Sequence, residues 1–407
     1  MNPNRIPRLE GMNNRLPDFV NRIDDKHYAR NIVNADLSDV GTLKRRQGST
    51  LKLGGTDCHS LWAYNNVAYY LDYDTLCIVS AGVKATAAPK FTPGRRWSFT
   101  QINGDIVATN GLRLMNIIGT TVKDYGLPIP VKVPMLRAGT NGSLPEGWYL
   151  VSVAYRSPSG ELGGATPPES IYIDADGSLT IANLDDTGVY GDLILYMSKP
   201  NGNDMYMIGT ALSTSLTLAL EPSYGHRCQT YLLTPMPAGD LIAYLNGRLY
   251  VSSGTILFHS EPYAPALHDP QRGYVPFPAP ITMIQPVKDG LFISSDQTYF
   301  YSNDPTKAEL DPVLPYKALM YASGTIDNST DVWWMSERGV CIGSPGGTVK
   351  NVQEAFVDVE PGTAGAVLFR DQDGHQQFIA SVFGPQQTVM AAKSFMDAEV
   401  IRKETIL

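Results

Sequence analysis

The chain has 407 residues, of which 43% are apolar, and its 32 basic and 40 acidic side chains give a formal net charge of −8. This length allows two domains or one large fold with an insertion, and the acidic balance excludes an overall basic field that would attract nucleic acid. The 37 glycines, 29 prolines and 22 tyrosines are typical of many short strands joined by turns. We therefore expect an all-β protein.

The first residues contain no apolar run, so we expect no signal peptide. No stretch of 18 apolar residues is present, so we expect no membrane insertion. The four cysteines, Cys58, Cys77, Cys228 and Cys341, have neither CxxC nor zinc-ligand spacing. We interpret them as reduced thiols of a protein made in a cytoplasm, ahead of disulfides or metal ligands.

Residues 1–57 are predicted to form an extended N-terminal arm. They show little periodic apolar pattern, and three prolines oppose long helices. Such an arm has little core of its own and gains order by lying across a neighbour. Its end carries the basic run Lys44-Arg45-Arg46, in a front segment of 60 residues with a net charge of +3. This run is either a contact to carboxylates of this chain or of a partner, or a solvated basic turn.

An apolar repeat runs through residues 58–137 and again through residues 223–407. Each unit is an aromatic or aliphatic run, a short polar turn and a second apolar run. Within each part the units are 38 to 45 residues apart, and the equivalent positions are Tyr69, Val107, Tyr250, Phe292, Trp334 and Ile379. This period is typical of β-propeller blades, so we predict a propeller of about six blades in two parts. A β-sandwich with accidental spacing is the alternative.

Residues 138–222 interrupt the repeat and are predicted to form an inserted β-sandwich. Seven short runs alternate apolar and polar residues, with turns at Ser159-Gly160, Asp176-Gly177 and Asn201-Gly202. The runs "WYLVSVAYRSPSGE" and "LYMSKPNGNDMYMIGT" resemble strand pairs of fibronectin type III and related immunoglobulin-like inserts. Ten acidic and two basic residues give this segment a net charge of −8, so charge is segregated between a basic front and an acidic insert.

No motif of an enzyme is found, and we expect no catalytic residues, cofactor or metal. The sialidase Asp-box, the GxSxG elbow, the phosphate loop and HExxH are all absent. The Asp-Gly runs at 174–177 and 371–374 favour hairpin turns over calcium loops. His259 and His268 share a Pro-rich loop, where packing is favoured over a paired metal site.

The segment "NIVNADLSDVGTLKRRQGSTL", residues 31–51, resembles the N-terminal signature of the tail nozzle and packaged-DNA-stabilising proteins of short-tailed phages. In that family an extended arm ends in a basic run and then enters a β-propeller. The resemblance implies arm and ring contacts at Asn34, Leu43, Lys44, Arg45, Arg46 and Gly48. The stretch 246–301, with its strand, "SEP" run, Pro-rich loop and "GLFISSDQTYFY", is similar to propeller-type phage virion proteins.

The resemblance implies a structural virion protein of a tailed bacteriophage, a tail nozzle or tail hub, assembled in the host bacterial cytoplasm. It would form a ring, a homohexamer in this family, below the portal and the head-tail adaptor. The ring would retain packaged double-stranded DNA and conduct it without sequence preference during ejection, beside tail fibres or spikes. A neutral to acidic wall suits a conduit, because every phosphate contact adds affinity. The alternatives are a tail-tip or receptor-binding component that contacts the host surface, and a propeller hydrolase acting on surface polysaccharide.

Overall fold

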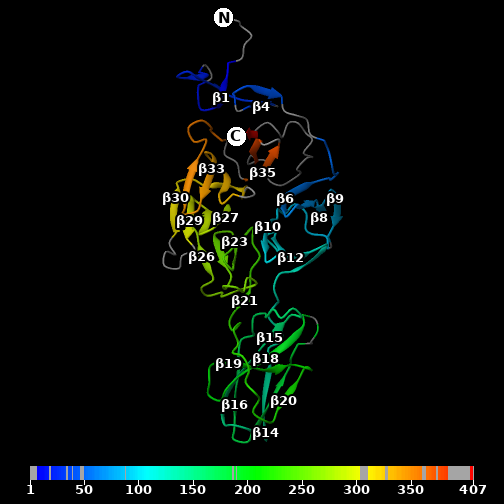
Figure 1. Cartoon of the computed structure of the whole chain (residues 1–407). Coiled ribbons are helices and arrows are strands. Elements are labelled where there is room, and N and C mark those ends of the chain that lie inside the picture. Colours follow the sequence, from blue (N-terminus) through cyan, green and yellow to red (C-terminus); the bar gives the residue numbers. More distant parts are fainter. Residues whose placement is uncertain are drawn as a thin grey trace.

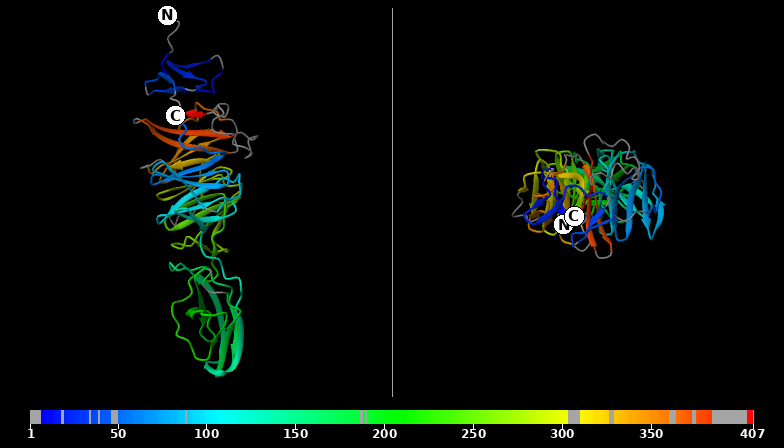
Figure 2. Two further views of the ribbon diagram at one scale, coloured as in Figure 1. Left: turned by 90° about the vertical axis from the view of Figure 1, so that its right-hand side faces the viewer. Right: turned by 90° about the horizontal axis from the view of Figure 1, so that it is seen from above.

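A computed structural model describes residues 7–17, 20–33, 35–38, 40–45, 50–87, 89–185, 188, 190–302, 310–325, 329–359, 364–372, 375–383 and 404–406. These residues form strands and turns and no helix, which confirms the expected all-β class. Among them, accordingly, no helix has the length and hydropathy needed to cross a bilayer. The molecule is elongated, with an N-terminal module (residues 7–45) at one end, a ring of sheets in the middle and an inserted domain at the other end (Figure 1, Figure 2).

The N-terminal module contains two small sheets, one with the order β1-β3-β2 and one made of β4 and β5. Its strands are β1 (Leu9–Met12), β2 (Arg22–Ile23), β3 (Lys26–Ala29), β4 (Ala35–Leu37) and β5 (Leu43–Arg45). The segment that we expected to be an extended arm is therefore organised into short strands over its described residues. β1 and β3 run parallel, and β4 and β5 form an antiparallel hairpin.

The ring contains four four-stranded sheets and one seven-stranded sheet. The first two sheets consist of β6 (Cys58–Tyr64), β7 (Val67–Asp72), β8 (Thr75–Ser80) and β9 (Val83–Thr86), then β10 (Ser98–Ile102), β11 (Asp105–Thr109), β12 (Leu114–Ile118) and β13 (Thr121–Asp124). The next two consist of β22 (Leu241–Leu245), β23 (Arg248–Ser253), β24 (Ile256–His259) and β26 (Tyr274–Pro276), then β27 (Met283–Val287), β28 (Gly290–Ser294), β29 (Thr298–Ser302) and β30 (Leu310–Leu314). The seven-stranded sheet joins β31 (Ala318–Thr325), β32 (Val332–Ser336), β33 (Gly339–Ser344) and β34 (Thr348–Asn351) to β35 (Ala364–Gln372), β36 (His375–Phe383) and β37 (Glu404–Ile406). Outside these sheets, β21 (Thr234–Pro235) pairs with β25 (Leu267–His268).

The sheets surround a common centre in the manner of β-propeller blades (Figure 1). The first strands of successive sheets are neighbours, so that β10 contacts β22, β22 contacts β27, and β27 contacts β31. The next step is a single parallel pairing of Met320 in β31 with Ala364 in β35, which links the last three strands to the fifth group of four. The ring is therefore built from sheets placed in chain order.

The six positions of the sequence repeat fall at one structural position, the second strand of each successive group of strands. Tyr69 lies in β7, Val107 in β11, Tyr250 in β23, Phe292 in β28, Trp334 in β32 and Ile379 in β36. The rings of Phe292 and Trp334, from neighbouring groups, have centroids 5.5 Å apart, and both side chains are fully buried. The large residues of the repeat thus fill the space between sheets, where burying a Phe side chain contributes about 2–3 kcal/mol.

Local turn chemistry explains why these segments fold back as hairpins. Asn103-Gly104 joins β10 to β11, and Asn246-Gly247 joins β22 to β23. All four residues have positive φ, with values of 51°, 98°, 48° and 81°. Two successive residues of positive φ are the requirement of the two-residue hairpin turn that matches strand twist, and Asn-Gly is the sequence that adopts it at least cost.

The inserted domain, called the insert here, contains the seven strands that we expected, in two sheets with the orders β14-β17-β20 and β16-β15-β18-β19. The strands are β14 (Met135–Leu144), β15 (Gly147–Arg156), β16 (Glu169–Ile173), β17 (Gly177–Ala182), β18 (Asp192–Ser198), β19 (Met205–Thr210) and β20 (Leu216–Leu218). The first strand begins at Met135, ahead of residue 138. The chain enters from β13 and returns to β22, so the insert interrupts the ring between its second and third sheets.

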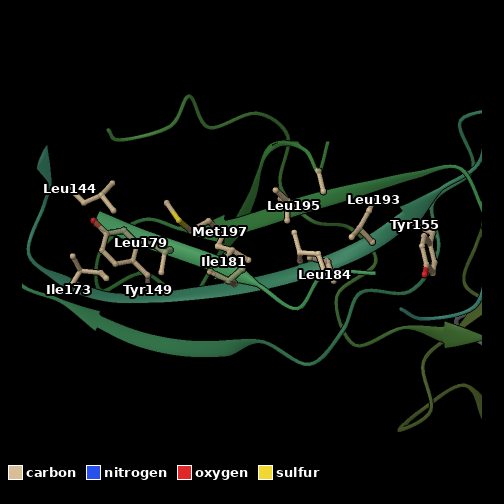
Figure 3. Close-up of a cluster of buried hydrophobic side chains, with 13 residues drawn as sticks. Leu144, Tyr149, Tyr155, Ile173, Leu179, Ile181, Leu184, Leu193, Leu195 and Met197 are labelled. Atoms are coloured by element: carbon tan, nitrogen blue, oxygen red, sulfur yellow. The ribbon is translucent and has the colours of Figure 1, made fainter. Parts of the chain in front are cut away.

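The two sheets of the insert enclose a continuous apolar core. Figure 3 shows this cluster of 13 buried residues, which extends from Leu144 and Tyr149 at one end to Tyr155 at the other. The Tyr155 end faces the ring, because the Tyr155 hydroxyl donates to Asp185 Oδ2 at 3.0 Å and the same carboxylate oxygen accepts from the linker amide of Val131 at 2.9 Å. The Leu144 end is the end far from the ring.

Candidate functional site

The predicted contact residues lie in or beside the β4–β5 hairpin of the N-terminal module. In this hairpin Ala35, Asp36 and Leu37 pair with Arg45, Lys44 and Leu43. All three residues of β5 are exposed. Of the six residues implied by the family resemblance, the structure thus brings Leu43, Lys44 and Arg45 together on one exposed strand, and Asn34, Arg46 and Gly48 lie outside the described residues.

The charges of β5 are available to a partner. Within the described part of the chain, neither Lys44 nor Arg45 forms an ion pair. An exposed pair to this chain's own acids would contribute at most about 1 kcal/mol, so little is lost when such a side chain turns to another molecule. The strand is also at the end of the molecule opposite the acidic insert (Figure 1).

Gly41 connects the β4–β5 hairpin to β1 through a backbone hydrogen bond. The Leu9 amide donates to the Gly41 carbonyl at 2.9 Å, and Gly41 is buried with a φ of +74°. A Cβ atom at this position would collide with the side chain of Arg8 and with the carbonyl oxygen of Leu9. Only glycine combines this φ with so close an approach of the backbone.

The module rests on one turn of the ring, residues 353–358, which follows β34. The Asn14 side chain donates to the Asp358 carbonyl at 2.8 Å and accepts from the Asp358 amide at 2.7 Å, while the Asn14 amide donates to the Phe356 carbonyl at 3.1 Å. The rings of Tyr28 and Phe356 stack with centroids 5.6 Å apart, and Arg15 donates to the Glu354 carbonyl. These partners are more than 300 residues apart in the chain, and no local pattern in the sequence indicated that they are in contact.

The side chain of Arg96, which precedes β10, contacts two aromatic rings of the seven-stranded sheet. Its guanidinium carbon lies 5.6 Å from the ring centroid of Tyr321 in β31 and 4.9 Å from that of Phe383 in β36. The β10 sheet is the second around the ring and β31 belongs to the fifth group of strands, so Arg96 reaches across the centre. The sequence did not single out Arg96, because Arg95 and Arg96 lie beside turn residues and belong to no repeated pattern.

Burial shapes the chemistry of this central contact. It raises the pKa of Tyr321 to about 12, with the negative charge of Asp240 adding to the rise, so the phenol stays neutral at ordinary pH. Burial also lowers the pKa of Arg96 from its usual value, yet a guanidinium keeps its proton. A cation held over two aromatic faces contributes about 0.5–2 kcal/mol. The contact therefore links the second sheet of the ring to two strands of the seven-stranded sheet.

The described residues include no group of three or more His, Cys, Asp and Glu side chains that could hold a metal ion. His268 is buried beside Phe258, at 5.8 Å between ring centroids, and burial lowers its pKa, as it does for His259. Asp174 and Gly177 close the turn between β16 and β17 through a backbone bond of 3.0 Å. The four cysteines are free thiols, and all but Cys58 are buried.

No protein-family model matches the chain, and no curated protein matches it in sequence. Among solved structures, it is similar to BBS1N from a complex with ARL6DN, at 12% identity, a TM-score of 0.33, and coverage of 82% of this chain and 93% of that one. It is similar to Hsv2 of Kluyveromyces lactis at 8% identity and a TM-score of 0.30, covering 78% and 86% of the two chains. The structure of apo AztD from Citrobacter koseri matches at 11% identity and a TM-score of 0.26, over 74% of this chain and 88% of that chain. At TM-scores of 0.33 and below, these likenesses carry no inference about function.

Proposed function

We propose that this chain is a structural protein of a tailed bacteriophage virion, the tail nozzle or hub that forms a ring below the portal and adaptor. The observation that carries the proposal is the exposed basic strand β5, on a small module that contacts one turn of the ring. It lies at the end opposite the insert, whose segment 138–222 has a charge of −8. A subunit with two such different ends suits a ring with one face toward an adaptor and the other outward.

The fold part of the proposal is a six-bladed propeller with a fibronectin type III-like insert. The six equivalent second strands support the blade number. The two-sheet packing of seven strands supports the type of insert. Because Arg96 joins two opposite parts of the ring, we place the DNA passage between copies of the chain and not through one propeller. A homohexamer, the family's ring, supplies such a passage.

The N-terminal module, which we expected to be an arm, is the part of the proposal to test. Deletion of residues 1–50 should prevent incorporation into particles while the ring and the insert stay folded. Quantitative mass spectrometry of purified particles would count this chain against the portal protein, and circular dichroism of the free variant would check its fold. The double variant Lys44→Ser/Arg45→Ser should reduce incorporation, and Lys288→Ser serves as a control at an exposed position in a ring turn. Infectious particles that contain the truncated chain at full copy number would contradict the proposal.

A second function, contact with the host surface, is favoured by one observation. Trp148 and Tyr172, paired across β15 and β16 at the insert's far end, are 55% and 39% exposed, with ring centroids 5.5 Å apart. Exposed aromatic pairs are typical of binding hot spots. Free protein should then compete with phage adsorption, and Trp148→Ala should abolish the competition. This candidate would be ruled out if the unmodified protein did not compete, or if the Trp148→Ala variant competed equally well.

A further inference from the structure

A hollow of about 310 Å³ opens on the outer face of the insert. Its floor is formed by β18 and β19, and one wall is the chain that returns from β20 toward the ring. This returning segment runs beside β19, where the Met207 amide donates to the His226 carbonyl at 2.9 Å and the Cys228 amide to the Met205 carbonyl at 2.8 Å. The opposite wall is the turn at residues 157–162. The volume is at the lower end of ligand pockets, which suits a ligand of about one sugar ring.

Basic side chains converge on this hollow in an otherwise acidic domain. Arg156 and Lys199 are the two basic residues of segment 138–222, and Arg156 lines the hollow. His226 and Arg227 reach it from the returning segment. Arg156, His226 and Arg227 therefore face one small cavity beside segment 138–222, whose net charge is −8. Such a concentration favours an anionic group on the ligand.

Each arginine is only partly neutralised. Arg156 Nη2 lies 2.7 Å from Asp192 Oδ2, and Arg227 Nη2 lies 2.6 Å from Asp204 Oδ1. A guanidinium has five N–H donors, so each arginine retains donors for a second acceptor. The carboxylates of Asp192 and Asp204 also limit the negative charge that the hollow accepts, because both would repel a phosphate dianion. A single carboxylate is the anion that fits this balance.

Tyr196 adds a neutral hydrogen-bond donor to the hollow. It lies in β18, lines the hollow and is only 3% exposed. Its hydroxyl group forms no hydrogen bond with any other described residue. The hydroxyl oxygen is not among the buried unpaired atoms, so it is reached from the hollow and is open to a hydrogen bond with a ligand. Burial raises the pKa of Tyr196 to about 12, so the hydroxyl is a neutral donor under ordinary conditions.

We propose that the hollow binds one acidic sugar unit, a hexuronic acid, whose carboxylate accepts hydrogen bonds from Arg156 and Arg227. The apolar face of the sugar ring would rest on Leu162, Ile194 and Met207. The ring hydroxyls would bond to Gln229 and to the hydroxyl of Tyr196. This inference goes beyond the proposed virion role and does not depend on it, because it concerns the free chain.

The test is isothermal titration calorimetry of the full chain with glucuronic acid and with a short oligomer of the same acid. Glucose, acetate, glucose 6-phosphate and an acidic dipeptide are the comparison ligands. Saturable binding of glucuronic acid is expected, at least about tenfold tighter than that of glucose, since hydrogen bonds to a charged group are lost with the neutral sugar. Equal binding of monomer and oligomer would assign the site to a free or terminal sugar, and tighter binding of the oligomer would assign it to a polysaccharide.

Two variants locate the site. Arg227→Gln, at a side chain that is 68% exposed, should weaken binding about tenfold, and Tyr196→Phe about fivefold. Arg113→Gln is the matched control, because Arg113 forms a similar pair with Asp124 at 2.7 Å in the ring, and it should leave binding unchanged. The proposal is overturned by no saturable binding of either acidic probe, by unchanged binding in both variants, or by equal or tighter binding of acetate, the phosphorylated sugar or the dipeptide.

Discussion

The insert and the N-terminal module are both attached to the ring, yet they are held together by different forces. The insert has a core of 13 buried side chains between two sheets (Figure 3). Among the described residues of the module, Leu9 is the one buried apolar side chain, and its strands are joined by backbone hydrogen bonds and by the contacts of Asn14. A domain with its own core folds as a unit, whereas a segment without one depends on what it touches. We expect the module to acquire its full order from its partners.

The largest expected effect is in the core of the insert. Leu195 is fully buried between the two sheets, and Leu195→Ala leaves a cavity that costs about 2–5 kcal/mol. The insert should then unfold at lower urea concentration than the ring, with the fluorescence of Trp148 reporting on the insert. Leu212→Ala, at a side chain that is 92% exposed, should change the transition by less than about 0.5 kcal/mol. Equal shifts in the two variants would show that the insert does not depend on this core.

A smaller effect is expected at the hairpin of the module. Gly41→Ala adds a Cβ against the Leu9 carbonyl at a φ of +74°, and this costs about 2 kcal/mol or more. Hydrogen exchange at the amides of Leu9 and Thr42 should rise, while exchange in the insert stays the same. Gly119→Ala, at a φ of +58° with open space around it, measures the strain of φ alone and should cost about 1 kcal/mol. Unchanged exchange at Leu9 in Gly41→Ala would mean that the module is already loose at this point.

The smallest effect is a difference in pH dependence between ring and insert. Burial lowers the pKa of His59, His259 and His268 in the ring, and segment 138–222 contains no histidine. As the pH falls through about 6.5, the unfolded chain takes up protons that the folded ring does not, so the ring loses stability down to the lowered pKa. The loss is at most about 1 kcal/mol for each histidine, because partly exposed groups keep part of their hydration. Thermal unfolding at pH 7.5 and 5.5 should shift the transition of the ring and leave that of the insert in place, and His59→Gln should reduce the shift. A larger shift in the insert would contradict this assignment.

The sequence predicted those parts of the fold that are recorded in local pattern. Alternating apolar residues and turn dipeptides repeat with each sheet, so Tyr250, Phe292 and Trp334 were aligned correctly from spacing alone. The seven strands of the insert followed from the same signals, since each hairpin contains its own turn chemistry. The start of β14 at Met135 was not predicted, because nothing in the linker marks where pairing with β17 begins.

The candidate site was less accessible to sequence reasoning, for a physical reason. Lys44 and Arg45 stood out by charge, and the structure shows them exposed. Asn14 and Arg96 did not stand out, because their contacts join segments that meet only after the ring has formed. Asparagine bonding to distant backbone groups leaves no periodic signal, and neither does an arginine whose partners are two aromatic rings on another sheet. The hollow of the insert was missed likewise, since its walls come from three separate segments.

The contact of Arg96 with Phe383 has a consequence for the order in which the protein is made. Phe383 lies in β36 and follows the first four sheets of the ring in the chain, and within the described residues none of β1 to β9 enters its sheet. During synthesis we therefore expect the earlier sheets to form an open arc, and the insert between β13 and β22 to be complete before that arc closes. No segment then has to be threaded through the ring. Closure requires only that the Phe383 ring packs against the Arg96 guanidinium. A nascent chain stopped before residue 383 should therefore contain a finished insert on an unclosed arc.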